Sequence, residues 1–204
     1  MEYIDLTHPI SNKMSTYPSD PDVTITREKD IINNNSLLHS FKMGTHTGTH
    51  LDVPAHIIED GKMINDFSVG KFTGIAIKID ESSYSTLDDI SYEIDGIIYD
   101  TGWYNFFSYP EKFYGSDRPI IPKDVIDYAL KKEVKFFGCD LPSIDQSGSV
   151  EKEIHNALLG SNIIIYESLT NLDQLPTLKQ FNFYGFPLPF HNLEGSPVRA
   201  VGIL

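Results

Sequence analysis

The sequence predicts a single mixed α/β domain, with a first half rich in strands and a second half in which helices and strands alternate. Three observations support this prediction. The chain has 204 residues, enough to bury one substantial core, and 40% of them are hydrophobic. Short runs of β-branched and apolar residues, separated by turn-forming residues, dominate the first half. In the second half, segments with helical spacing precede compact apolar runs. We therefore treat residues 1–204 as one domain.

The expected strands of the first half share a high content of branched and aromatic residues. The run at 74–79 is the clearest, because three isoleucines alternate with other residues after a glycine. Turn-forming pairs, Asp60-Gly61 and Asp95-Gly96, separate the runs. The four expected strands are residues 23–26, 36–42, 74–79 and 96–99.

Two helices are expected in the second half. One begins at Pro122, because proline is tolerated in the first turn of a helix, and continues to Leu130. The other runs from Ser149, a suitable N-cap, to Leu159, and Gly160 is a plausible stop. Strands are expected at residues 134–137, 162–167 and 198–203, which gives the alternating pattern.

Composition excludes several classes of partner. The chain carries 16 basic and 29 acidic residues, a formal charge of −13, and has no stripe of Lys or Arg. Such a field repels phosphate backbones, so we expect no nucleic-acid partner. No apolar stretch approaches the roughly 20 residues that cross a bilayer, and the first residues lack a secretion signal. The single cysteine, Cys139, fits a reducing compartment. We therefore expect a cytoplasmic protein with no membrane partner.

The histidines concentrate in one segment, since four of the seven lie between residues 39 and 56. Within it His46, His50, Asp52 and His56 are spaced by four, two and four residues. Even spacing places all four side chains on one face of an extended strand, although Pro54 can bend the strand before His56. Imidazoles and a carboxylate are the ligands that divalent transition metals prefer. The segment therefore predicts a metal site.

Other interpretations leave part of this pattern unexplained. A single histidine is more often a surface or hydrogen-bonded core residue than a ligand, but the four positions together favour a metal. His50 and Asp52 with a distant His155 also resemble the facial triad of non-haem iron oxygenases, which leaves His46 and His56 without a role. A non-catalytic structural zinc site usually has four ligands and often uses cysteine, of which there is one.

The segment His46–His56 resembles the H-x-G-T-H-x-D-x-P-x-H signature of the metal-dependent cyclase family, and it matches every fixed position. This family includes bacterial kynurenine formamidases and isatin hydrolases. The resemblance extends along nearly the whole chain. Further similar stretches are Asp5–Ile10, Met14–Pro21, Thr101–Trp103, Gly138–Asp140, His155–Leu159, Glu167–Leu172 and Gly195–Ala200.

The resemblance implies a ligand set and a fold. His46, His50 and Asp52 would hold one metal, and Asp52 would bridge to a second metal held by His155 and Glu167. The ion would be zinc or manganese, one or two per chain. His56 would act as general acid and base. The implied fold is the family's α/β arrangement, assembled as a homo-oligomer, either a dimer or a tetramer.

The resemblance also implies a small-molecule substrate. The expected reaction is hydrolysis of an amide-type C–N bond in a small aromatic compound, such as release of formate from N-formylkynurenine. Ring opening of a cyclic amide such as isatin is the alternative within the family. Tyr17 stands where kynurenine formamidases carry a tryptophan, which weakens an assignment to kynurenine itself. Tyr17 and Trp103 are the residues expected to contact the aromatic ring.

Overall fold

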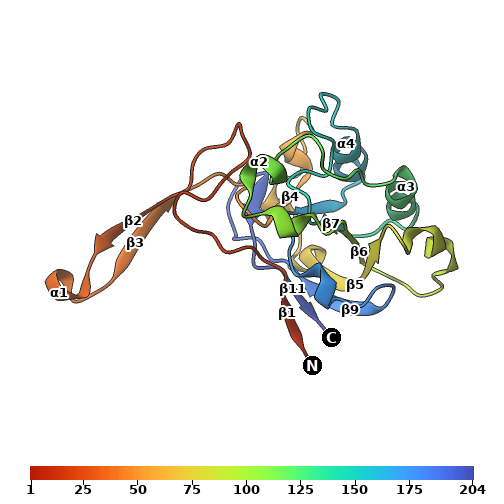
Figure 1. The fold of residues 1–204 in the computed structure, drawn as a ribbon, viewed down its shortest axis with the longest axis horizontal. Coiled ribbons are helices and arrows are strands. Elements are labelled where there is room, and N and C mark those ends of the chain that lie inside the picture. The colour runs from red at the N-terminus through yellow and green to blue at the C-terminus, as the bar shows by residue number, and fades with distance from the viewer.

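A nine-stranded sheet is the centre of the computed structural model, which describes residues 1–204 except for the side chains of residues 88 and 89. The strand order is β1-β11-β9-β5-β6-β7-β8-β4-β10 (Figure 1). Its strands are β1 (Tyr3–Asp5), β4 (His50–Asp52), β5 (Thr73–Asp80), β6 (Gly96–Asp100), β7 (Phe136–Cys139), β8 (Ile164–Glu167), β9 (Gln180–Tyr184), β10 (Gly195–Pro197) and β11 (Val201–Ile203). Both the first and the last strand of the chain belong to this sheet, so one sheet unites the fold as the single mixed α/β domain predicted from the sequence.

The middle of the sheet is parallel and its flanks are antiparallel. Strands β5, β6, β7 and β8 pair in parallel, while β4 and β10 on one side and β9, β11 and β1 on the other pair antiparallel. The parallel strands are apolar and mostly buried, as strands covered on both faces must be. Gly96 allows β6 to pair closely with β7, because a Cβ at that position would lie 1.9 Å from the ring of Phe136.

The helices are short and lie mainly in the second half of the chain. The α-helices are α1 (Ile31–Asn34), α2 (Pro110–Phe113), α3 (Lys123–Lys131) and α4 (Glu153–Gly160). Six 3-10 helices connect other elements: η1 (Pro54–His56), η2 (Ile64–Asp66), η3 (Val69–Phe72), η4 (Tyr84–Asp89), η5 (Trp103–Phe106) and η6 (Leu172–Gln174). No helix in the described part of the chain has both the length and the apolar character needed to cross a membrane.

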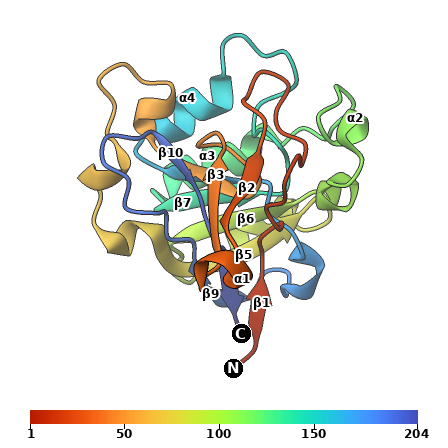
Figure 2. The ribbon, with the colours of Figure 1, turned by 90° about the vertical axis from the view of Figure 1, so that its left-hand side faces the viewer.

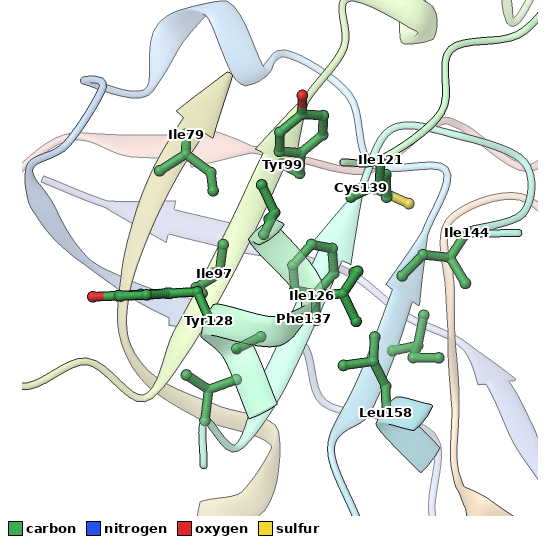
Figure 3. Packing of buried hydrophobic residues seen from close by; sticks show 14 of the residues in the cluster. Ile79, Ile97, Tyr99, Ile121, Ile126, Tyr128, Phe137, Cys139, Ile144 and Leu158 are labelled. Atoms are coloured by element: carbon green, nitrogen blue, oxygen red, sulfur yellow. The ribbon is translucent and has the colours of Figure 1, made fainter. Parts of the chain in front are cut away.

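The sheet has a hydrophobic core on each face. On one face α3 and α4 pack over the parallel strands, and Ile126 and Leu158 of the helices meet Ile97 and Phe137 of the strands (Figure 3). The second core, on the other face, contains Tyr166 among its fully buried side chains. Burying a side chain of this size stabilises the fold by about 1.5–3 kcal/mol, so the two cores fix the strands rigidly enough to position a site.

A separate hairpin stands away from the body of the molecule. Strands β2 (Thr24–Lys29) and β3 (Leu38–Lys42) form a two-stranded sheet with α1 at its tip, and they project to one side in Figure 1 and toward the viewer in Figure 2. We call residues 24–42 the arm. Every residue of β3 is exposed, and Ile32 at the tip is 92% exposed. An isolated two-stranded hairpin is only marginally stable in water. Packing of the exposed arm against another surface would therefore stabilise it.

The predicted elements correspond to observed ones, with three differences. The helix expected from Ser149 begins at Glu153, because Ser149 Oγ caps a preceding turn by accepting from Lys152 N. Of the extended segment expected at residues 46–56, only β4 is a strand. Strands β1, β9 and β10 and helices α1 and α2 were not expected, although β9 alternates buried Phe181 and Phe183 with more exposed residues.

Candidate metal centre

The site begins with the register of two antiparallel strands. β4 lies between β8 and β10, and His50 stands opposite Glu167 in the β4–β8 ladder. Partners in register project to the same face of a sheet, and His50 and Asp52 are two residues apart, so all three side chains share one face. All three are buried, with exposed fractions of 1–3%. A buried imidazole therefore faces two buried carboxyl groups.

A tight turn before β4 brings His46 to this group. Gly48 has a φ of +62°, a left-handed conformation that favours glycine, and the turn interrupts the extended backbone. His46 Nδ1 lies 2.7 Å from Asp52 Oδ1, and its Nε2 lies 3.2 Å from Glu194 Oε1. The Gly48 carbonyl accepts a hydrogen bond from His50 Nδ1 at 2.8 Å, which leaves His50 Nε2 directed at the carboxyl groups.

A 3-10 turn after β4 returns His56 to the same place. Pro54 occupies the first position of η1, where its fixed φ suits a helical turn and ends the strand. The ring of His56 lies 4.2 Å from that of His46 and 5.6 Å from that of His155, measured between centroids. A bend at Pro54 was expected, but the turn at Gly48 before β4 was not. Turns on both sides of β4, and not a straight strand, bring these side chains together.

Helix α4 supplies His155 from the other side of the cluster. Asp145 accepts a hydrogen bond from His155 Nδ1, and its second oxygen accepts from Ile154 N at 2.8 Å. The imidazole is thereby oriented with Nε2 3.4 Å from Glu167 Oε1 and 3.6 Å from Asp52 Oδ2. Glu167 Oε1 is itself fixed by Ile144 N at 2.6 Å. The five residues expected to bind metal, His46, His50, Asp52, His155 and Glu167, thus converge on one buried point.

His46 is hydrogen-bonded directly to Asp52, but the distances from His50 and His155 to the carboxyl groups suit a shared ion better than direct hydrogen bonds. His50 Nε2 lies 3.5 Å from both Asp52 Oδ1 and Glu167 Oε2, which is beyond the usual hydrogen-bond length. Two ligands about 2.1 Å from a tetrahedral ion are about 3.4 Å apart. Asp52 Oδ2 is buried without a hydrogen-bond partner among the described residues, which is costly unless a cation satisfies it. The donor set and this unpaired oxygen fit a divalent transition metal.

Two ligand groups can be recognised, and they share Asp52. One contains His46, Asp52 and His56, and the other contains His50, Asp52 and Glu167. If each group held an ion, Asp52 would be a ligand of both. The grouping differs from the expected one, because His50 is grouped with Glu167 across the ladder and His46 is grouped with His56. His56 consequently has the geometry of a ligand as well as that of a neighbouring base.

Burial and the neighbouring ionisable groups shift the pKa values of the cluster in opposite directions. Burial lowers the pKa of His46 and of His155, but Asp52 and Asp145 more than compensate, so the pKa of His46 is raised to about 9 and that of His155 to about 10. Burial opposes ionisation of Asp52, yet the adjacent imidazoles of His46 and His50 hold its pKa well below the usual range. For His56, burial dominates and lowers the pKa. A metal ion bound to His46 and His155 would have to displace protons from these imidazoles.

A cavity of about 230 Å³ opens onto the cluster. Tyr17 lies on its wall, as expected, and its ring meets that of Tyr114 edge-on with centroids 6.0 Å apart. The cavity is lined by Tyr17, Ser19, Asp20, His46, His50, Asp52, His56, Ile57, Pro142, Ser143, Lys152, His155 and Glu167. A space of this size suits a ligand with one ring, since drug-sized ligands occupy about 300–1,000 Å³.

Trp103 does not line this cavity. Its side chain is buried in the core, where the indole Nε1 donates to the Phe113 carbonyl at 3.0 Å and the ring contacts Phe106. The prediction that Trp103 contacts substrate is not supported by this position, because its only polar atom is already satisfied. Asp145, Glu194 and Lys152, in contrast, were not predicted as site residues. The sequence gives no spacing that links Glu194 to His46, which precedes it by 148 positions.

The fold brings together buried His, Asp and Glu side chains of the kinds that bind metal ions in proteins. The family model named Cyclase matches residues 4–146, which is more than half of the chain. The chain therefore belongs to the Cyclase family, as its signature indicated.

Known relatives agree with this membership. The kynurenine formamidase of Geobacillus thermodenitrificans is 30% identical over 206 aligned positions, which cover 97% of this chain and 95% of that protein. The kynurenine formamidase of Bacillus cytotoxicus is 28% identical over 211 positions, covering 98% and 96%. The crystal structure of an isatin hydrolase bound to the product analogue thioisatinate has a TM-score of 0.87 and 22% identity, covering 100% and 92%. This last likeness establishes the fold alone.

Proposed function

We propose that this protein is a metal-dependent amidohydrolase that cleaves the C–N bond of a small aryl formamide and releases formate. The observation that carries the proposal is the convergence of His50, Asp52, Glu167 and His155 on a buried point beneath a small cavity, with Asp52 Oδ2 unpaired. A membership in the Cyclase family and similarity to kynurenine formamidases add support.

The site residues have two roles: five of them would bind the metal, and one would transfer a proton. His46, His50, Asp52, His155 and Glu167 would hold one or two ions, with zinc and manganese as the candidates. A bound divalent ion acidifies water and polarises a carbonyl group, which are the two requirements for amide hydrolysis at neutral pH. Asp145 and the Gly48 carbonyl keep His155 Nε2 and His50 Nε2 directed inward.

His56 would transfer the proton. Its pKa is lowered by burial, so the imidazole is neutral at pH 7 and can accept a proton from the attacking water on a ring nitrogen. The same imidazole can then donate that proton to the leaving nitrogen. Tyr17 provides an aromatic wall for the substrate ring.

Hydrolysis of a cyclic amide of the isatin type is the second candidate. Its support is the close likeness of the fold to that of an isatin hydrolase, together with Tyr17 at a position where kynurenine formamidases carry tryptophan. Both reactions need the same attack on an amide carbonyl, so one set of residues can serve either.

Metal content and turnover test the proposal together. We expect mass spectrometry of the purified protein to find near-stoichiometric zinc or manganese, and chelation to abolish hydrolysis of N-formylkynurenine or isatin. Asp52→Asn should lose both the metal and the activity, while Lys123→Asn, at an exposed side chain of α3 that does not line the cavity, should retain both. Metal without turnover of either amide would contradict the substrate class, and no metal after reconstitution would contradict the site itself.

We also propose that the protein is a homo-oligomer in which the arm packs on a second copy of the chain. The arm has three basic and two acidic residues, whereas the remaining chain has 13 basic and 27 acidic residues. The apolar side chains of the arm therefore stand on a slightly basic element, which complements the acidic body of another copy. Nothing in this proposal depends on the substrate.

A further inference from the structure

One lysine lines the cavity beside the candidate metal centre. Lys152 is the only lysine or arginine among the lining residues, and the acidic ones are Asp20, Asp52 and Glu167. Asp52 and Glu167 are committed to the imidazoles and to the ion that these groups would hold. Lys152 and Asp20 are thus the charged groups left for contact with a ligand. A charge on the wall of a small cavity acts strongly, because little water screens it.

The backbone holds Lys152 in an unusual conformation at the start of α4. Its φ of 48° and ψ of 49° are left-handed, a conformation that residues other than glycine, asparagine and aspartate rarely adopt. Two interactions fix it: Lys152 N donates to Ser149 Oγ at 3.2 Å, and its carbonyl accepts from Asn156 N at 2.8 Å. Lys152 thus stands three residues before His155, among the residues that line the cavity.

The ammonium group of Lys152 has no partner of its own. Within the part of the chain that the structure describes, it makes no hydrogen bond or ion pair, and Asp20 on the same cavity wall is not paired with it. The residue as a whole is half-buried. A lysine in this position can donate up to three hydrogen bonds to a ligand without breaking an existing contact.

We infer that Lys152 forms an anion subsite that binds a carboxylate on the substrate. The inference rests on the proposed function and narrows it to aryl amides that carry an acidic substituent. The amide group would lie at the cluster around Asp52, the ring against Tyr17, and the carboxylate at Lys152. The small cavity keeps these three contacts within reach of a single-ring compound. Lys152 binds and selects the substrate in this arrangement and takes no part in proton transfer.

A pair of formamides tests the subsite. N-formylanthranilate carries a carboxylate beside the amide, and formanilide is its neutral counterpart. We expect Lys152→Asn to raise KM for N-formylanthranilate about 10-fold, the effect of losing one charge-assisted hydrogen bond, and to leave KM for formanilide unchanged. Asparagine tolerates the left-handed backbone, so this variant should fold normally. Lys152→Arg should retain most of the preference. Lys123→Asn changes the net charge equally, and its side chain is 82% exposed on α3, so it controls for the overall field.

A binding measurement that needs no turnover tests the anion subsite independently of the proposed reaction. Benzenesulfonate is an aromatic anion that coordinates metals poorly, and calorimetry of the zinc-loaded protein should show that Lys152→Asn weakens its binding about 10-fold. If no formamide is hydrolysed, the proposed function fails while this titration still decides the role of Lys152. Unchanged benzenesulfonate binding, or an equal rise in KM for both formamides, would overturn the anion subsite.

Discussion

Asp145 and His155 form a buried pair in which one carboxylate performs two tasks. Its Oδ2 accepts the Nδ1–H of His155, and its Oδ1 accepts the backbone N–H of Ile154 in the first turn of α4. Nδ1–H donation fixes the ring orientation and exposes Nε2 to the cluster. Asp145 is therefore a positioning residue, and it also caps the helix that carries the ligand.

Replacing Asp145 separates these two tasks. Asp145→Asn keeps an oxygen for Ile154 N but loses the charge that supports the imidazole, so we expect metal affinity to fall about 10–100-fold with little loss of stability. Asp145→Ala should lose affinity and in addition about 1 kcal/mol of stability, because the helix loses its cap. Zinc titration against a competing chelator and urea unfolding measure the two effects. Wild-type affinity in Asp145→Asn would show that Asp145 acts only as a cap.

Metal binding should release protons. His46, with a pKa raised to about 9, and His155, with a pKa raised to about 10, are protonated at neutral pH in the metal-free protein, and both must lose a proton to bind an ion. Affinity should therefore rise about 10- to 100-fold per pH unit between pH 6 and 8, corresponding to one or two protons.

Calorimetry in buffers of different ionisation enthalpy counts these protons. A pH-independent affinity, with no proton released, would mean that neither imidazole is a ligand.

His56 can be a base or a ligand, and one substitution distinguishes the roles. His56→Ala should retain the metal and lose about 10²–10⁴-fold in kcat if the imidazole transfers the proton. If His56 completes the group with His46 and Asp52, the same variant should instead lose an ion. Metal analysis of the purified variant alongside its kcat decides between them, with His191→Ala, at an exposed histidine outside the cluster and the arm, as a matched control.

The sequence predicts the chemistry of this site better than its geometry. The ligand types at positions 46, 50 and 52 indicated a metal, and the apolar run ending at Glu167 indicated a strand. The pairing of β4 with β8 could not be predicted, because 112 residues separate Asp52 from Ile164 and register depends on the whole sheet. The even spacing suggested a straight strand, whereas Gly48 and Pro54 bend the chain on both sides of it.

Trp103 shows a second limit of prediction from the sequence. An aromatic residue in a family-like stretch is equally compatible with a pocket wall and with a core, and only the tertiary structure reveals that the Phe113 carbonyl satisfies its indole N–H. The sequence could not predict Lys152 as a site residue for a similar reason. Its role depends on a left-handed φ and on a cavity, and neither leaves a pattern in the surrounding sequence.

Acid should destabilise the fold through His8. This buried imidazole stacks on Phe107, and burial lowers its pKa to about 4 from about 6.5 in the unfolded chain. Its neutral form supports the fold above pH 6.5, and this contribution is lost as the pH falls toward 4 because the unfolded chain takes up the proton first. The loss at pH 4.5 should reach about 2–3 kcal/mol.

Comparison with His8→Phe isolates this residue from the carboxyl groups that titrate in the same range. The variant keeps an aromatic ring against Phe107, so its free energy of unfolding should fall less between pH 7.5 and 4.5 than that of the wild type. Equal losses in both proteins, measured by urea unfolding, would show that His8 is not responsible.

The arm should determine the oligomeric state. Phe41 on β3 is 64% exposed and Ile32 at the tip is 92% exposed, and burying two such side chains against a second copy would contribute about 3–6 kcal/mol to assembly. We expect light scattering after size exclusion to give a mass of at least a dimer for the wild type. Phe41→Asp should lower that mass toward the monomer, because a charge would be buried in the contact. Val69→Asp makes the same kind of change at a residue of the body that is 68% exposed, and should not alter the mass. A monomeric wild type at micromolar concentration would refute the role of the arm, since its apolar side chains would then remain in water.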